Sequence, residues 1–100
     1  MIAGWGGSEA LKLIYRQHAI KRMHERRITE AEIHSALETG QVIESYPNDT
    51  PHPSALLLGM AGTKTVHVVY ADNSEGYERI IITVYEPDPA IWHDDFKTRR

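Results

Sequence analysis

The stretch TVHVVYADNSEGYERIIITVY, residues 65–85, gives the clearest indication of the fold. Residues 65–70 and 78–86 are rich in β-branched and aromatic side chains, which are favoured in strands. The segment Asp-Asn-Ser-Glu-Gly at 72–76 is typical of a hairpin loop. Pro87 cannot donate a hydrogen bond to a sheet, so we expect the second strand to end before it. The stretch therefore predicts two neighbouring antiparallel strands.

Two further strands are predicted upstream of this hairpin, at residues 41–46 and 55–60. Residues 47–53, which are rich in Pro, Asn and Asp, and residues 61–63 supply the turns. Short connections make consecutive strands antiparallel neighbours. The sequence therefore predicts a four-stranded antiparallel β-meander.

Two helices are predicted before the strands, which makes the expected fold class α+β. Thr29 is a good N-cap for the second helix, and Glu32 completes a capping box with it. Gly40 is placed to end this helix in the left-handed conformation. The first helix is expected over residues 15–27. Whether it begins earlier, or whether residues 11–14 are extended, stays open.

The composition is that of one soluble globular domain of 100 residues, with 41% hydrophobic and 25% charged side chains. We expect residues 1–10 to be a flexible N-terminal lead-in and residues 11–100 to form the domain. Residues 89–97 are compatible with a short C-terminal helix whose Trp92 and Phe96 pack back onto the domain. The sequence has no secretion signal and no membrane-spanning run, so a cytoplasmic protein with no membrane partner is expected.

Positive charge is concentrated near the start of the chain, although the formal net charge is −3. Residues 12–27 carry six basic residues and one acidic residue, which is a local charge of +5. Residues 28–100 carry five basic and twelve acidic residues. An anionic partner can therefore be steered to the first helix despite the overall sign.

A line of three side chains on that helix could bind phosphate. His18, Arg22 and Arg26 are spaced four residues apart, which places them on one face beside the apolar face. Guanidinium groups match phosphate oxygens bidentately, and histidine can move a proton near neutral pH. Lys21 flanks the line and is expected to contact the substrate. The alternative is an exposed basic face that forms only weak surface ion pairs.

A second group of candidates lies on the last predicted strand. Alternation places Thr83 and Tyr85 on one face, together with Ile81. A hydroxyl and a phenol side by side can hold a phosphate or donate to a leaving group. His67, on the preceding strand, joins the substrate-binding residues if it faces the same side. The alternative is that these residues are ordinary structural residues of a half-buried sheet.

No metal ion or cofactor is expected. The chain has no cysteine and no His-x-x-x-His pair, so the common zinc ligand patterns are missing. The glycines at 4–7 are not followed by the Lys-Ser/Thr pair of a phosphate-binding loop.

The string HAIKRMHERRIT, residues 18–29, resembles the opening signature of the domain-of-unknown-function family DUF4258. Further strings similar to that family follow in the same order: Gly40-x-Val42-Ile43-Glu44, Leu58-Gly59, His67-Val68-Val69 and Ile82-Thr83-Val84-Tyr85-x-Pro87-Asp88. The resemblance spans about residues 13–92. One departure is Arg27, where such sequences often carry glycine.

The resemblance implies a branch of the small bacterial ribonuclease-toxin superfamily, which includes the RelE-like toxins and is similar in fold to barnase, EndoU and colicin nucleases. It implies helices followed by a four-stranded antiparallel sheet, and a cognate antitoxin protein as partner. The catalytic positions that it implies are His18, Arg22, Arg26, Thr83 and Tyr85.

Three functions are consistent with these features. The first is a toxin that acts as a metal-independent endoribonuclease on RNA, such as ribosome-bound mRNA, and leaves a 2′,3′-cyclic phosphate. The second is a non-catalytic RNA- or protein-binding module of the same fold. The third is an interaction protein that pairs its exposed sheet edge with a partner strand.

Overall fold

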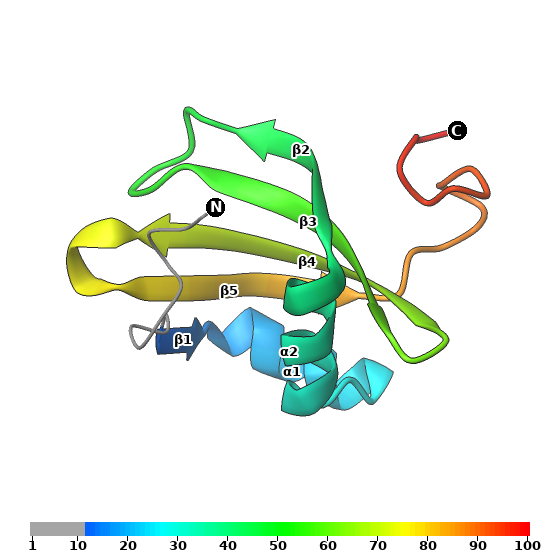
Figure 1. Ribbon diagram of the computed structural model, residues 1–100, viewed down its shortest axis with the longest axis horizontal. Coiled ribbons are helices and arrows are strands. Elements are labelled where there is room, and N and C mark those ends of the chain that lie inside the picture. Colours follow the sequence, from blue (N-terminus) through cyan, green and yellow to red (C-terminus); the bar gives the residue numbers. More distant parts are fainter. Residues whose placement is uncertain (1–11) are drawn as a thin grey trace.

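The computed structural model describes residues 12–100, so the predicted lead-in at 1–10 lies outside the described residues. Its elements follow the chain in an order that begins and ends with a strand (Figure 1). They are β1 (Lys12–Tyr15), α1 (Gln17–Arg26), α2 (Glu30–Thr39), β2 (Gln41–Tyr46), β3 (Ser54–Ala61), β4 (Lys64–Asn73), a short 3₁₀ helix (Ser74–Gly76) and β5 (Glu78–Tyr85). No helix within 12–100 is long and apolar enough to cross a membrane.

The sheet corrects the predicted four-stranded antiparallel meander. Strands β2 to β5 do form antiparallel neighbours, but β1 adds a fifth strand in parallel to β5, in the order β1-β5-β4-β3-β2. The parallel pairing runs from Lys12 opposite Glu78 to Tyr15 opposite Ile81. The sequence left open whether residues 11–14 are extended, and the structure shows that residues 12–15 are. Hydrophobic periodicity reports only local structure, so it could not predict that this four-residue strand pairs with β5, the last strand of the chain.

The second helix begins as predicted and ends differently. The Thr29 side chain accepts from the Glu32 amide at 3.1 Å, and the Glu32 carboxylate accepts from the Thr29 amide at 2.9 Å, so the capping box is confirmed. Gly40 is extended, with φ −85° and ψ 167°, so its predicted left-handed conformation is wrong. A Cβ on Gly40 would lie 2.6 Å from the Ala36 carbonyl oxygen. Close packing, and not a left-handed backbone, therefore explains why glycine occupies this position.

The hydrophobic core lies between the helices and one face of the sheet. α2 packs against β3 and β4, and α1 packs against β5 and lies on the β5 side of the sheet (Figure 1). The core residues of the helices and strands are almost completely buried: Ala19, Ile28, Ile33, Ala36, Leu57, Val66, Val68, Ile81 and Val84. This packing fixes α1 against β5, which is the arrangement on which the candidate site depends.

The C-terminal segment, residues 86–100, folds back over the sheet without forming a helix, so the short helix at 89–97 is not present. The carboxylate of Asp88 accepts from the Ala90 amide, and that of Asp95 accepts from the Lys97 amide, each at 2.9 Å. Such local side-chain bonds compete with helical ones. Trp92 is nevertheless 2% exposed, as its predicted packing requires.

Candidate functional site

A cavity of about 370 Å³ lies where α1, the end of β5 and the C-terminal segment meet. Five of its residues are the predicted catalytic positions, brought together from two distant segments. The lining residues are His18, Arg22, Arg26, Thr83, Tyr85, Glu86, Asp88, Ile91, Trp92 and Arg99. The helix line and the last strand therefore share one concave site.

The parallel strand β1 places α1 beside this cavity. Its last pair joins Tyr15 to Ile81, and the Arg16 amide then donates to the Ile81 carbonyl at 3.1 Å. The chain turns into α1 at that point, so the helix continues along the edge of β5. His18, Arg22 and Arg26 lie one turn apart on the helix and line the cavity.

The helix side of the cavity is cationic. Arg22 forms an ion pair with Glu25 at 3.7 Å, in which both side chains are more than one third exposed. Such a pair is weak in water and leaves Arg22 available to a ligand. Within residues 12–100, His18 and Arg26 form no ion pair with a carboxylate. This wall can therefore receive an anion without breaking a strong contact.

Thr83 and Tyr85 form the strand side of the cavity. They lie opposite Val69 and His67 in the register with β4, while the intervening Val84 points into the helix-covered core. The two hydroxyl groups therefore project from the sheet face that the helices leave uncovered, as their predicted alternation requires. Burial raises the pKa of the Tyr85 phenol above its ordinary value, so the phenol keeps its proton at neutral pH.

Ile81 lies on the opposite face, in the core, so the prediction that it shares a face with Thr83 and Tyr85 is wrong. Val69 is opposite Thr83 but Tyr70 is opposite Ile81, so Ile82 is an extra residue that forms a bulge in β5. The bulge turns Ile81 into the core together with Val84.

His67 and Lys21 are not part of the cavity lining. His67 is fully buried in β4 behind Tyr85. Its Nδ1 is 3.3 Å from the Tyr85 hydroxyl and its Nε2 is 2.8 Å from the Phe96 carbonyl oxygen. Burial lowers the pKa of His67, which favours the neutral ring. Lys21 is exposed on α1 outside the cavity.

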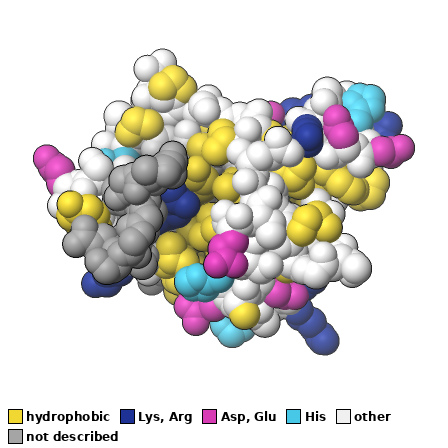
Figure 2. Space-filling model, in the orientation of Figure 1, with side chains coloured by type: hydrophobic (Ala, Val, Ile, Leu, Met, Phe, Trp, Pro, Cys, Tyr) yellow, Lys and Arg dark blue, Asp and Glu magenta, His cyan; other side chains and the backbone are white. Residues whose placement is uncertain are grey.

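The C-terminal wall of the cavity was not predicted from the sequence. It contributes Glu86, Asp88, Ile91, Trp92 and Arg99, of which only the packing of Trp92 was expected. Charged side chains of both signs gather on this segment, at the upper right of Figure 2. The signal that could have found it is the apolar pair Ile91-Trp92 within an otherwise polar tail.

Arg99 holds this wall against the sheet. Its guanidinium donates to Glu44 of β2 at 3.2 Å and lies 4.5 Å from the centre of the Trp92 ring. The Tyr46 hydroxyl donates to the same carboxylate. The hydrogen bond from Arg99 is the main reason that the pKa of Glu44 lies below its ordinary value. Arg99 thus joins β2, Trp92 and the cavity.

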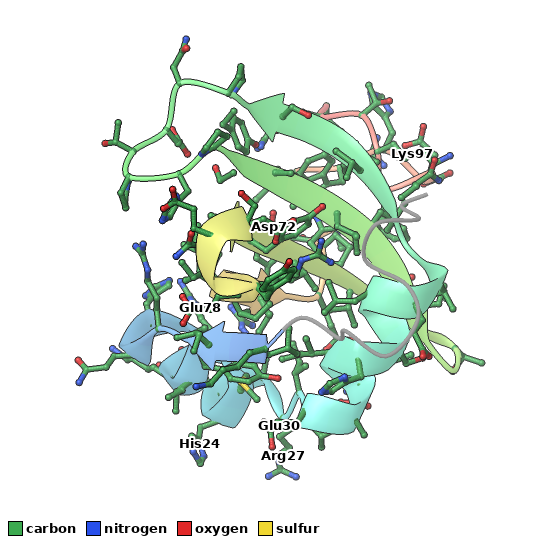
Figure 3. All side chains as sticks on the ribbon, turned by 60° about the vertical axis from the view of Figure 1, so that its left-hand side comes forward. His24, Arg27, Glu30, Asp72, Glu78 and Lys97 are labelled. Carbon is green, nitrogen blue, oxygen red and sulfur yellow. The ribbon has the colours of Figure 1, made fainter. Side chains whose placement is uncertain are left out.

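A second hollow, of about 430 Å³, is a weaker candidate for an anion site. Its charged lining residue is Asp72, which lies near the β4–β5 hairpin (Figure 3). Asp72 accepts two hydrogen bonds from Arg79, at 2.7 and 2.8 Å, and Arg79 lies 4.3 Å from the centre of the Tyr70 ring. These charges neutralise each other.

The fold and the cavity define a small α+β domain with a cationic helix facing two hydroxyl side chains. Comparison with protein families identifies the family to which this domain belongs. The model of a domain of unknown function, DUF4258, matches residues 15–86, and the chain belongs to that family. Comparisons with curated proteins and with solved structures found no match. The matched region contains the five predicted catalytic positions, whereas Asp88, Ile91, Trp92 and Arg99 lie beyond it.

No group of three His, Asp or Glu side chains within residues 12–100 is placed to hold a metal ion. The residues that line the cavity supply imidazole, guanidinium, hydroxyl and carboxylate groups. Arginine pairs suit phosphate, and a histidine beside them can transfer a proton.

Proposed function

We propose that the protein is a metal-independent endoribonuclease that acts as the toxin of a toxin–antitoxin pair, in the RelE-like branch of small ribonuclease folds. The observation that carries the proposal is the meeting of His18, Arg22 and Arg26 with Thr83 and Tyr85 around one cavity. Two arginines and a histidine on one wall suit a phosphodiester, and the hydroxyls opposite suit a sugar-phosphate.

The proposed reaction uses the 2′-hydroxyl of RNA as its own nucleophile. The 2′-oxygen attacks the adjacent phosphorus and loses its proton, while the bond from phosphorus to the 5′-oxygen breaks and that oxygen gains a proton. The products are a 2′,3′-cyclic phosphate and a 5′-hydroxyl. His18 serves as general base or general acid for one of the two proton transfers.

The other residues of the cavity stabilise the charge that develops during this reaction. Arg22 and Arg26 line the same wall of the cavity and offer donors to the phosphorane oxygens. Thr83 hydrogen-bonds the phosphate, and Tyr85 positions the reacting nucleotide. A proton-transfer group of this kind contributes about 10²–10⁴-fold in rate.

Cleavage of RNA by the purified protein tests the proposal. We expect cleavage of free or ribosome-bound RNA that persists with EDTA and ends in 2′,3′-cyclic phosphates. His18→Ala should lower the rate about 10²-fold or more. Lys21→Ala is the matched control, because this substitution also changes a side chain of α1 and Lys21 does not line the cavity. Equal activity of wild type and His18→Ala, in cleavage and in growth arrest, would show that the cavity is not catalytic.

A second candidate function is non-catalytic binding of RNA or an acidic protein. It is favoured by the exposed Lys12, Arg16 and Lys21, which extend positive charge beyond the cavity. The Arg27 side chain also points away from the domain (Figure 3). Binding that weakens steeply with salt while the RNA stays intact would support this function over catalysis.

The antitoxin is part of the proposal and has its own test. If a small gene lies beside that of the toxin, expression of the two together should yield a complex of fixed stoichiometry that relieves growth arrest. If no such partner binds, the toxin assignment fails while the cleavage assay still decides the enzyme assignment. The outer strand β2 is the alternative binding edge for a partner strand.

A further inference from the structure

His67 is a buried polar residue directly behind the cavity. It lies opposite Tyr85 in the register of β4 and β5, and no part of it is exposed. Its ring meets Tyr85 and Trp92 edge-on, with ring centres 5.2 and 4.6 Å apart. A leucine or valine would fill such a place without the cost of burying a polar ring, so its two nitrogens require an explanation.

For a neutral His67 ring, the two hydrogen-bond partners fix the direction of both bonds. The Phe96 carbonyl oxygen, 2.8 Å from Nε2, can only accept, so Nε2 carries a proton. In a neutral ring Nδ1 is then an acceptor, and the Tyr85 hydroxyl at 3.3 Å must donate to it.

The surroundings of His67 favour this neutral form. Burial lowers the pKa of the ring more than any other influence. Among the charged groups around it, Arg99 on the C-terminal segment acts in the same direction and Glu44 on β2 acts against it.

The consequence concerns what Tyr85 offers to the cavity. Its one proton is directed at His67, so its oxygen presents lone pairs to the cavity and can accept a hydrogen bond there. A phosphate oxygen is also an acceptor and would not bind such a group. The 2′-hydroxyl of ribose is a donor and lies next to the 3′-phosphate that the arginines of α1 suit.

We propose that His67 is a positioning residue that holds the Tyr85 hydroxyl as a hydrogen-bond acceptor for the ribose 2′-hydroxyl of the bound nucleotide. The inference rests on the proposed function for the identity of the ligand. It assigns Tyr85 to the nucleophile side of the reaction and makes the His67–Tyr85 pair the element that distinguishes RNA from DNA.

Binding of nucleotides that cannot be cleaved tests this inference apart from catalysis. The probes are the four nucleoside 3′-monophosphates and their 2′-deoxy analogues, measured by calorimetry or NMR titration. We expect the wild type to favour the ribonucleotide about three- to tenfold, the effect of one hydrogen bond. Tyr85→Phe should reduce this preference to about one, without weakening the deoxynucleotide.

Variants of His67 separate positioning from a merely structural role. His67→Phe should lose most of the ribose preference, because Tyr85 is then free to rotate. His67→Gln should keep it, because a side-chain amide can donate to Phe96 and accept from Tyr85. Val68→Ala is the matched control: Val68 is the next residue on β4, is buried on the helix side, and should cost stability without changing the preference.

A spectroscopic measurement checks the hydrogen-bond directions even if His67→Phe does not fold. Long-range ¹H–¹⁵N correlations of the wild type should show a His67 ring protonated at Nε2 and bare at Nδ1. A ring protonated at Nδ1 overturns the inference, as does an unchanged ribose preference in Tyr85→Phe or the absence of binding by all the nucleotides at millimolar concentration. If the preference holds and no RNA is cleaved, the positioning role stands and the catalytic proposal fails.

Discussion

Replacement of Trp92 by alanine tests whether the C-terminal segment is an integral wall of the cavity. Trp92 is 2% exposed, and the centre of its ring lies 4.6 Å from the His67 ring centre and 4.5 Å from the guanidinium carbon of Arg99. A tryptophan buries about 150–250 Å², which at about 25 cal/mol per Å² corresponds to roughly 4–6 kcal/mol. Large-to-small substitutions of buried aromatic residues cost about 3–5 kcal/mol. We therefore expect Trp92→Ala to lower the free energy of unfolding by about 3–5 kcal/mol.

Urea denaturation followed by circular dichroism measures this loss and reveals its form. If the segment stays docked around the missing ring, the midpoint falls and the slope m is unchanged. If the segment detaches before unfolding, m also falls, because less surface remains to be exposed. Ile91→Ala is the matched control, because Ile91 is the next residue of the same wall but is 50% exposed, and it should cost less than about 1 kcal/mol.

The result that would refute this reasoning is specific. A Trp92→Ala loss below about 1 kcal/mol with unchanged m would mean that Trp92 does not pack against the sheet. The C-terminal wall, the buried state of His67 and the shape of the cavity would then all be wrong.

Three further predictions concern stability and use the same unfolding assay. Arg27 adopts a left-handed conformation with φ 54°, so Arg27→Gly should be neutral or stabilising by up to about 1 kcal/mol. His24→Gly, within the last turn of α1, should instead cost about 0.5–1 kcal/mol, and the reverse order would contradict the backbone geometry. A Cβ on Gly59 would lie 2.6 Å from the Ala36 Cα, so Gly59→Ala should cost about 1–3 kcal/mol or more, and a neutral result would show that α2 packs less closely on β3. The pKa of His67 is lowered in the folded state, so below about pH 6.5 the unfolded chain binds more protons than the folded chain. The free energy of unfolding should therefore fall on acidification, by up to about 1.4 kcal/mol per pH unit. His67→Gln should remove this slope, and an unchanged slope would exclude His67 as its source.

The features that the sequence predicted correctly are those set by neighbouring residues. The capping box depends on Thr29 and Glu32, three positions apart, and the β4–β5 hairpin depends on one loop between two β-branched runs. The i, i+4 line of α1 and the alternation of Thr83 and Tyr85 are local in the same sense. Local periodicity therefore identified both halves of the candidate site.

The features that the sequence did not predict depend on contacts between distant residues. Nothing near Lys12–Tyr15 indicates that β5 is its partner. Nothing in the sequence near Arg99 indicates that its guanidinium will donate to Glu44 of β2. Charged residues in a tail are usually solvated, so the apolar pair Ile91-Trp92 is the local sign of the C-terminal wall, and the contacts of Arg99 with β2 could not be predicted from it.

The relative position of the two halves of the site follows from two details of β5. The parallel pairing with β1 stops at Ile81, which is where the chain turns into α1, so the helix lies beside the remaining residues of the strand. The bulge at Ile82 follows at once and lets Ile81 and Val84 both enter the core. Thr83 and Tyr85 are then left on the other face, level with the line of His18, Arg22 and Arg26. A strict alternation through residue 82 would place either Ile81 or Val84 outside the core, so the same irregularity that completes the core also orients the hydroxyl groups of the candidate site.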